Sequence, residues 1–327
     1  MSNEGYASRA SREVLLVGLG AVAETHVKAL EEIPGVVITA GVDKAFARVV
    51  SFRGSSVPIY KTIEGAACHH NPDLVIVATP TSTHAAVCAE VVSVFPTAEV
   101  LVEKPASDNL PDAVRMLVDF ATRTTINVAY HMAFSPEVIW AQRIFQEKVG
   151  VHGAPLAIQA LFSDPYESQV ESAKTRYCSS WIDSGINAVS VIQRFCHIIT
   201  RRSLRSLGPD SWSAFEGRFL CQFDTNEFEA LVLTSWHVSD PGRTTRIKFR
   251  SGAELIMDHH AVAGYWIGSK GVEECFGSNG QPPRRLAHYR NLYRTYLVDH
   301  IPMMSAQESC HLHKLVLCTD GSGADLL

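Results

Sequence analysis

The sequence predicts an α/β protein in two parts: a doubly wound parallel sheet, then an α+β domain built on a large, mainly antiparallel open sheet. Up to about residue 126, short apolar runs alternate with helix-length segments, as in right-handed βαβ units. A glycine-rich turn follows the first apolar run. After residue 126 the alternation gives way to longer β-like runs with short turns, which is typical of antiparallel pairing.

Length and composition limit the possible classes. A chain of 327 residues with 46% hydrophobic content suits two domains, and we expect them at 12–126 and 127–327 after a polar tail, 1–11. The net charge of −5 suggests no nucleic-acid partner. No leader and no apolar run of the roughly 18 residues that cross a bilayer is present, so we expect a cytoplasmic protein with no membrane partner. The scattered cysteines and the histidine clusters lack ligand spacing, so no metal site is expected.

The first part should contain five strands, and the first of them ends in a Gly-x-Gly-x-x-Ala turn. The strands are expected at 13–18, 36–42, 74–79, 99–103 and 125–130. Gly18 permits a tight turn, and Gly20 lets the backbone approach a pyrophosphate. Ala21 and Val22 lead into a helix whose N-terminal N–H groups would face the phosphates. The turn therefore predicts a Rossmann dinucleotide site.

The second strand ends in Asp43, at about the separation from the first glycine where a ribose-binding acid is expected. Its carboxylate would accept hydrogen bonds from the ribose hydroxyls and repel a 2′-phosphate. NAD is therefore favoured, while Lys44 and Arg48 lie close enough to keep NADP possible. The alternative is a solvated residue or a helix cap.

The third strand leads into Thr79, Pro80 and, a helical turn later, His84. Ligands of open α/β sheets bind at the carboxyl ends of the strands, so these residues are expected beside the dinucleotide. The neighbouring Thr81 and Ser82 hydroxyls could equally well only cap the following helix.

The fourth strand ends in Glu103 and Lys104 at the same edge. Adjacent strand residues point to opposite faces, so a simple ion pair between them is the less favoured alternative. Glu103 is expected near the cofactor. Lys104 is expected to point into the cleft, where a lysine could exchange protons near neutrality.

The second part should begin with a helix and continue with long strands. The helices are expected at 138–148, 183–200 and 286–300, the strands at 154–162, 217–223, 228–238 and 244–256, and a loop at 277–285. An open antiparallel sheet of this size needs a covered face. A second copy of the chain is the simplest cover, so we expect a homodimer or homotetramer.

The order and spacing of these motifs resemble those of the Gfo/Idh/MocA family of sugar and cyclitol oxidoreductases, over nearly the whole chain. The matching segments are Gly18-x-Gly20, Asp43, Thr79-Pro80 with His84, Glu103-Lys104-Pro105 and Asp183-Ser184-Gly185-Ile186-Asn187. The resemblance implies a Rossmann domain, a C-terminal domain whose open sheet forms subunit contacts, and a substrate pocket lined by Lys104 and Asp183. Asn187 stands where the family carries a histidine that acts as acid and base. An amide cannot transfer a proton at neutral pH, so Asn187 is expected only to orient a substrate oxygen.

Further substrate contacts are expected from two segments. Tyr130 and His131 follow the last strand of the first part, and His131 could take over proton transfer; a satisfied histidine at a domain junction is the alternative. A polar, aromatic stretch before the 183–200 helix could wall the pocket. It contains Tyr166, Arg176, Tyr177 and Trp181. Asp183 could instead cap that helix, and Asn187 could satisfy a buried carbonyl.

These observations predict an NAD(P)-dependent oxidoreductase that moves a hydride between nicotinamide and a secondary alcohol or ketone. The substrate would be a sugar, nucleotide sugar or cyclitol, with Lys104 as the proton-transfer group and Asp183 and Asn187 beside it. Two alternatives stay open: a non-catalytic sensor of dinucleotide or ligand on the same scaffold, and a reductase of a substrate that is not a carbohydrate.

Overall fold

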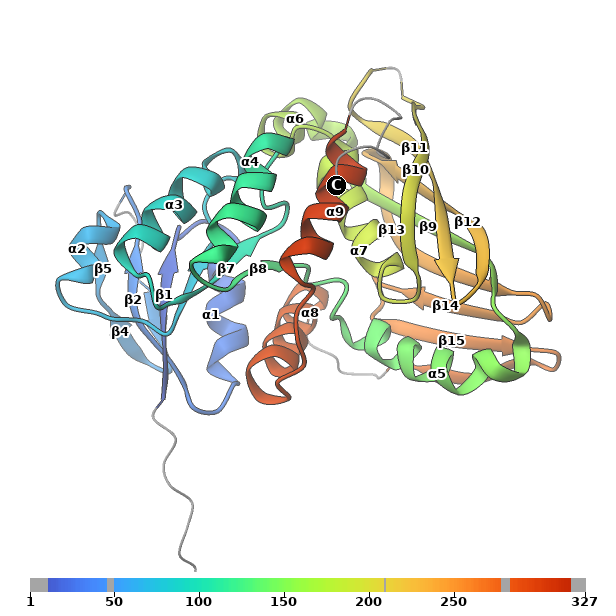
Figure 1. The fold of residues 1–327 in the computed structure, drawn as a ribbon, viewed down its shortest axis with the longest axis horizontal. Helices are drawn as coiled ribbons and strands as arrows, with labels where there is room; N and C mark the ends of the chain where they lie inside the picture. The colour runs from blue at the N-terminus through green and yellow to red at the C-terminus, as the bar shows by residue number, and fades with distance from the viewer. Residues whose placement is uncertain (1–10, 46–49, 209, 278–282, 319–327) are drawn as a thin grey trace, which may run out of the picture.

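The N-terminal part of the molecule is a parallel sheet with helices on both faces (Figure 1). The computed structural model describes residues 11–45, 50–208, 210–277 and 283–318. The strand order in the six-stranded sheet is β5-β2-β1-β6-β7-β8, and every pair in it is parallel. The strands are β1 (Arg12–Val17), β2 (Val36–Val42), β5 (Ile59–Tyr60), β6 (Leu74–Val77), β7 (Glu99–Glu103) and β8 (Ile126–Ala129). A doubly wound sheet is confirmed.

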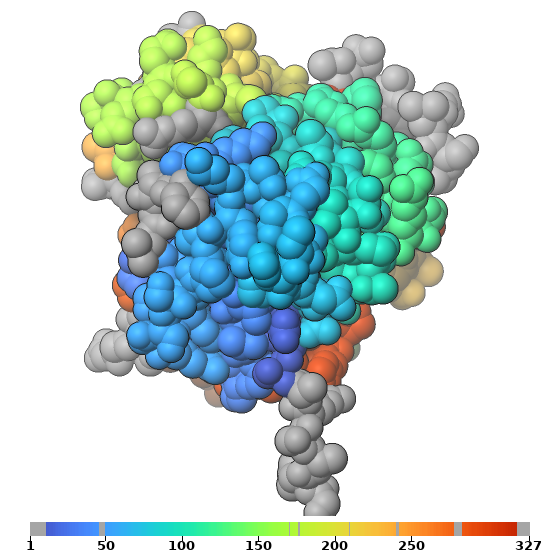
Figure 2. Space-filling view, turned by 90° about the vertical axis from the view of Figure 1, so that its left-hand side faces the viewer, coloured from blue at the N-terminus to red at the C-terminus, as the bar shows by residue number. Residues whose placement is uncertain are grey.

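The central strands are nearly continuous apolar runs because both of their faces are covered. All four residues of β6 are buried. The covering helices are α1 (Ala23–Glu31), α2 (Ile63–Ala67), α3 (His84–Val94) and α4 (Leu110–Val114), with a small hairpin of β3 (Val50–Phe52) and β4 (Ser55–Val57). Figure 2 looks onto this part, where these elements cover most of the face in blue to green and the red C-terminal helices emerge at the lower right.

The second part is an eight-stranded sheet with the order β10-β11-β12-β9-β13-β14-β15-β16. Its strands are β9 (Pro155–Pro165), β10 (His197–Ser206), β11 (Ala214–Phe223), β12 (Asn226–Ser235), β13 (His237–Phe249), β14 (Glu254–Asp258), β15 (Ala263–Gly268) and β16 (Gly271–Phe276). The pairing is antiparallel except between β9 and β12. The expected α+β domain with a large, mainly antiparallel sheet is therefore present.

Three helical segments follow the start of the second part: α5 (Pro136–His152), α6 (Val170–Tyr177) and α7 (Ile186–Ile192), which a π-turn at Trp181–Gly185 precedes. The predicted helix 183–200 is wrong after Ile192, where α7 ends, and β10 begins at His197. The predicted strand 244–256 is two strands. Gly252, with a φ of +87°, turns the chain between them.

The C-terminal helices α8 (Arg284–Tyr293) and α9 (Ala306–Leu317) connect the two parts. α8 packs against α1, and α9 packs against α4 and α7. Buried polar contacts fix this docking: His26 Nδ1 lies 2.6 Å from the Tyr293 hydroxyl, and His313 Nε2 accepts from the Ala106 amide at 2.9 Å. The carboxyl ends of β6, β7 and β8 thereby face α6, α7 and α8. Within the part of the chain that the structure describes, no helix is long and apolar enough to span a bilayer.

Candidate active site

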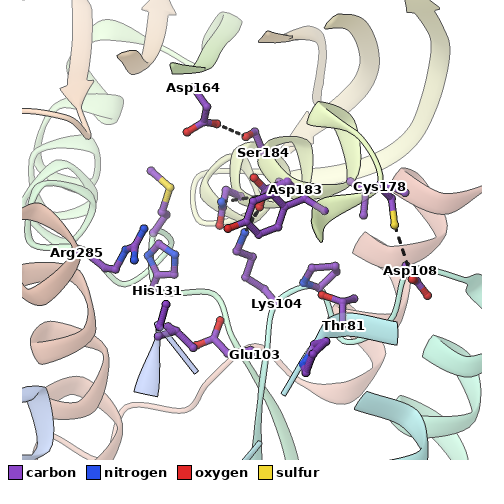
Figure 3. Close-up of a pocket in the computed structure, with 18 of the residues that line it drawn as sticks. Thr81, Glu103, Lys104, Asp108, His131, Asp164, Cys178, Asp183, Ser184 and Arg285 are labelled. Carbon is purple, nitrogen blue, oxygen red and sulfur yellow. Dashed lines mark hydrogen bonds and ion pairs between the residues drawn. The ribbon is translucent and has the colours of Figure 1, made fainter. Parts of the chain in front are cut away.

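A cavity of about 570 Å³ lies where the two parts meet, and its volume is in the range of small-molecule sites (Figure 3). The first part contributes Ala21 and Val22 and the strand-end segments at Thr79 and Lys104, and His131 follows β8, the last strand of the first sheet. The second part contributes its aromatic segment, the π-turn and the start of α8. The structure therefore brings most of the predicted site residues to one place.

The glycine turn has the shape that a dinucleotide requires. Gly18 has a φ of +89°, and a Cβ on it would lie 2.8 Å from the backbone of Ala78, so only glycine fits there. A Cβ on Gly20 would meet nothing within 4 Å, which leaves open space next to the start of α1. Val22 at the helix N-cap offers no side-chain acceptor to the first N–H groups. This turn fits a pyrophosphate.

Asp43 ties the end of β2 to the glycine turn. Its Oδ2 accepts a hydrogen bond from the Leu19 amide at 2.8 Å, and its Oδ1 accepts one from the Ala45 amide at 2.8 Å. Each carboxylate oxygen keeps a second lone pair, so the group can also accept from a ribose hydroxyl. Lys44 is exposed next to it, and Arg48 lies outside the described residues.

His84 holds together the two strand ends that border the cavity. Its Nε2 lies 2.8 Å from the Thr79 carbonyl oxygen, and its Nδ1 lies 3.0 Å from that of Pro105. Burial lowers the pKa of His84. The side chain therefore positions the Thr79-Pro80 turn and the segment after Lys104, and Thr79 and Pro80 themselves line the cavity.

Lys104 and Asp183 form an ion pair across the cavity (Figure 3). Lys104 Nζ donates to Asp183 Oδ1 at 2.7 Å and to the Asp183 carbonyl oxygen at 3.0 Å. The two side chains are 12% and 14% exposed, so both reach the cavity without facing bulk water. Since an ammonium has three N–H donors, one is left for an oxygen in the cavity.

The turn that carries Asp183 is fixed from behind. The ring of Trp181 stacks on Phe219 at 6.0 Å, and its Nε1 donates to the Val316 carbonyl. Ser184 donates to Asp164 at 2.6 Å. The π-turn begins at Trp181, so Asp183 lies within it and not at its N-cap. The carboxylate of Asp183 binds Lys104 instead, and the alternative that Asp183 caps the helix is wrong.

Asn187 lines the cavity one helical turn after Asp183. Its Nδ2 donates to the Asp183 carbonyl at 3.3 Å, so it does satisfy a buried carbonyl. Its Oδ1 is buried with no partner among the described residues. The structure thus leaves one acceptor here for a hydroxyl donor from a ligand.

Glu103 is buried, and its carboxylate contacts one side chain from α1 and one from α8. The Tyr289 hydroxyl donates to Glu103 Oε1 at 2.6 Å, and His26 Nε2 lies 3.0 Å from the same oxygen. Burial by itself raises the pKa of Glu103, but His26 and then Tyr289 outweigh it and hold the pKa below its ordinary value. Glu103 is therefore a charged anchor at the edge of the cavity.

His131 lines the cavity between two other rings. It stacks on Tyr289 at 4.8 Å and on His288 at 5.7 Å. Burial, together with the charges of His288 and Lys104, lowers the pKa of His131 well below 6.5. The imidazole is therefore neutral at pH 7 and a weaker base than a free histidine.

Two predicted substrate contacts do not reach the cavity. Tyr130 is fully buried beside His313, and Trp181 is buried in the core against the sheet. Both are corrected to core residues, because their large apolar rings fill the space behind the turns that carry the site. Tyr177 does line the cavity and stacks on Tyr166 at 6.0 Å. The side chain of Arg176 lies outside what the structure describes.

Several cavity residues were not predicted from the sequence. They include Asp108, Asp164, Arg243, Arg284, Arg285 and His288. Arg243 and Asp164 pair across β13 and β9, and their proximity depends on a strand register that the sequence does not reveal. Arg284 and Arg285 are the last residues of the predicted loop 277–285, but in the structure they begin α8, whose docking places them at the cavity.

The fold and the cavity define a dinucleotide-binding protein of the Rossmann class with a second, sheet-based part that borders the same cavity. Residues 12–131 match the model of the Gfo/Idh/MocA family, described as an oxidoreductase family with an NAD-binding Rossmann fold. This segment is therefore similar to the NAD-binding domain of that oxidoreductase family, and the cofactor of such a domain is NAD.

Solved structures with the same fold cover nearly the whole chain. One is GenD2 from gentamicin A biosynthesis in complex with NAD, which has 17% identity, covers 99% of this chain and 97% of that one, and has a TM-score of 0.70. An oxidoreductase from Agrobacterium radiobacter, in complex with NAD⁺, L-tartaric acid and magnesium, has 13% identity, 94% coverage of both chains and a TM-score of 0.74.

A protein from Sinorhizobium meliloti 1021, provisionally described as a myo-inositol dehydrogenase, has 14% identity, covers 93% of this chain and 95% of that one, and has a TM-score of 0.69. At these identities the likeness shows a shared fold. A search of curated proteins found no match.

Proposed function

We propose that this oxidoreductase transfers a hydride between NAD and a secondary alcohol or ketone of a sugar, nucleotide sugar or cyclitol. The observation that carries the proposal is the Lys104–Asp183 pair, which stands in the cavity beside the carboxyl ends of β6 and β7. When bound, NAD supplies a carbon that accepts or gives up a hydride. The residues of the chain must then bind the substrate, orient it and move one proton.

Lys104 is the proposed proton-transfer group. Two of its N–H bonds are held by Asp183, and the third is free to meet the reacting oxygen of the substrate. In the direction of reduction the ammonium donates a proton to the carbonyl oxygen, and in oxidation the neutral amine removes the proton of the alcohol. Proton transfer by a positioned side chain contributes about 10²–10⁴ to the rate.

Asp183 and Asn187 are proposed to orient the substrate. Asp183 keeps Nζ in place, and the unpaired Oδ1 of Asn187 accepts from a second hydroxyl. Two adjacent acceptors suit a polyol better than an isolated carbonyl compound. His131 is the less suitable base, because its lowered pKa weakens it.

A screen for turnover tests this proposal. Binding of NADH and NADPH is measured first by fluorescence, and a panel of sugars, sugar acids and cyclitols is then tested for a change in nicotinamide absorbance. Turnover of a polyol is expected, with tighter binding of NADH because Asp43 disfavours a 2′-phosphate.

The second candidate function is a sensor of dinucleotide or ligand, and the observation that favours it is the amide at Asn187, which cannot act as acid or base. Binding of NADH without turnover across the whole panel, with reduced and oxidised cofactor, would favour the sensor. Turnover of a ketone that carries no hydroxyl groups would instead favour the reductase of a substrate outside the carbohydrates.

We propose also that the open sheet is a contact between copies of the chain. Helices α5 and α7 pack on one face of the sheet, through β14, β15 and β9. On the strands, Leu156, Leu161 and Tyr265 are exposed, at 57%, 43% and 37%. A homodimer or homotetramer would cover such side chains. Light scattering coupled to gel filtration tests this, and a monomer at micromolar concentration would exclude it.

A further inference from the structure

Two arginines at the start of α8, Arg284 and Arg285, line the cavity without an ion-pair partner in the part of the chain that the structure describes. Neither takes part in an ion pair or hydrogen bond with any residue that the structure describes. Burial and the charge of Arg285 lower the pKa of Arg284, and the buried Glu137 carboxylate, which acts on it without contact, offsets only part of this. By contrast, the other two cations of the cavity are neutralised: Arg243 binds Asp164 and Lys104 binds Asp183. Arg284 is half-buried and Arg285 is exposed, so it is the guanidinium of Arg284 that loses solvent without gaining a hydrogen-bond partner among the described residues.

The acidic side chains of the cavity are all engaged elsewhere. Asp183 and Asp164 hold the two cations just named. Glu103 accepts from Tyr289 and lies beside His26. Asp108 accepts from Cys178 Sγ at 3.7 Å, and Figure 3 shows it on the side of the cavity opposite Arg285. The positive charge at Arg284 and Arg285 is therefore left for a group that enters the cavity.

The surroundings of the two arginines place this charge on the substrate side. Both act on the titration of His131, and Figure 3 shows Arg285 next to that ring. Tyr166, from the segment after β9, is within their electrostatic reach as well. The Nδ1 of His131 is buried without a partner among the described residues and adds one more polar atom. The phosphates of a dinucleotide are expected instead at the Gly18–Val22 turn.

We propose that Arg284 and Arg285 form an anion subsite, so that the substrate carries a carboxylate or a phosphate in addition to the carbon that exchanges the hydride. This proposal rests on the proposed function above and narrows its substrate class to acidic or phosphorylated polyols. The planar guanidinium group suits both anions, because it donates two parallel hydrogen bonds to two oxygens. The start of α8, which has no side-chain cap, adds N–H groups of the same polarity.

Binding to the full-length protein saturated with NADH tests the subsite without any need for turnover. Calorimetry measures the affinity for inorganic phosphate, and for D-glucuronate against D-glucose, in wild type, Arg284→Gln and Arg285→Gln. Wild type is expected to bind phosphate and to bind glucuronate more tightly than glucose. Each substitution should lower the affinity for phosphate and the affinity for glucuronate by about tenfold. Arg290→Gln is the matched control, because Arg290 lies on the same helix and pairs with Glu32.

A second measurement, on wild type alone, tests the subsite even if the variants fail to fold. In wild type, raising sodium chloride from about 0.05 to 0.5 M should weaken phosphate binding, since the attraction between the charges is screened. Failure of wild type to bind phosphate, or variants that bind it as tightly as wild type, would overturn the proposal. A loss of NADH affinity in the variants would overturn it too, because the arginines would then hold the cofactor.

The outcome is separable from that of the proposed function. If anions bind through the two arginines but no panel member is turned over, the subsite stands and hydride transfer fails. If wild type and the arginine variants turn over a neutral polyol equally well, the hydride-transfer proposal stands and the subsite proposal fails.

Discussion

Lys104 and Asp183 are 79 positions apart in the chain, and Lys104 Nζ lies 2.7 Å from Asp183 Oδ1. The lysine follows β7 of the parallel sheet, and the aspartate sits on the π-turn before α7. Because the two residues come from different parts of the molecule, their contact depends on how the parts dock. The docking is fixed by α8 and α9, which pack on both.

Lys104→Met should remove proton transfer while leaving the cofactor in place. We expect turnover to fall by about 10²–10⁴, because no other cavity side chain is a comparable acid and base, while the NADH affinity stays nearly unchanged. Steady-state kinetics measures turnover, and fluorescence titration measures the NADH affinity. Lys28→Met is the control, since Lys28 is an exposed residue of α1 that pairs with Glu24. Turnover close to that of wild type would remove Lys104 from the mechanism.

Asp183→Asn should slow turnover while leaving the NADH affinity unchanged. The amide oxygen still accepts from Lys104 Nζ, but a neutral acceptor holds an ammonium less strongly than a carboxylate does, so Nζ is positioned less well. We expect kcat to fall by about tenfold, measured by steady-state kinetics with an NADH titration beside it. Asp224→Asn, in the hairpin between β11 and β12, is the matched control. A kcat equal to that of wild type would show that the carboxylate does not position the reacting group.

The two glycines of the turn should respond differently to alanine. Gly18→Ala places a Cβ 2.8 Å from the Ala78 backbone at a φ of +89°, so we expect a loss of stability of about 1–3 kcal/mol. Gly20→Ala meets nothing within 4 Å, so the protein should unfold at the wild-type temperature and bind NADH more weakly. Thermal unfolding and NADH titration separate the effects. Unchanged NADH affinity in Gly20→Ala would place the pyrophosphate elsewhere.

The protein should lose stability as the pH falls from neutral to about 4, in part through His313. Its Nδ1 faces the Ser309 carbonyl and its Nε2 accepts from the Ala106 amide, so the folded state needs the neutral ring. Burial lowers the pKa of His313 from 6.5 to about 4. The unfolded chain therefore takes up a proton first, and the contribution of His313, roughly 3 kcal/mol, is present above pH 6.5 and lost as the pH falls toward 4.

Chemical denaturation at several pH values measures this loss. His313→Gln should make the free energy of unfolding less dependent on pH in this window, while His260→Gln, at an exposed position, should leave the dependence as in wild type. An equal slope in His313→Gln and wild type would contradict the assignment.

Much of the first part was predictable from the sequence because its strands are buried on both faces and read as continuous apolar runs. The glycine turn, Asp43 and the strand-end residues Thr79 and Lys104 follow from the same topology. The C-terminal docking was not predictable: nothing in the 277–300 pattern indicates that Tyr289 reaches Glu103 or that Arg285 lines the cavity.

The second sheet was harder to predict. Strand β10 was missed because the apolar periodicity of α7 runs without a break into Ile198. Tyr130 is expected at the substrate because the chain leaves the first part there, and Trp181 because it stands in a polar, aromatic segment. In the structure both rings are buried in the core. Short-range patterns predict the elements. They do not predict which face of an element another part of the chain will cover.

A crystal structure of the protein with NAD bound tests the central claim most directly, through the position of Lys104 Nζ relative to carbon C4 of the nicotinamide. We expect the ring to lie against Thr79 and the segment at Lys104, with Nζ within hydrogen-bonding reach of an oxygen on a carbon that faces C4. A ring bound away from this edge of the sheet, with Lys104 held by Asp183 alone, would contradict the account.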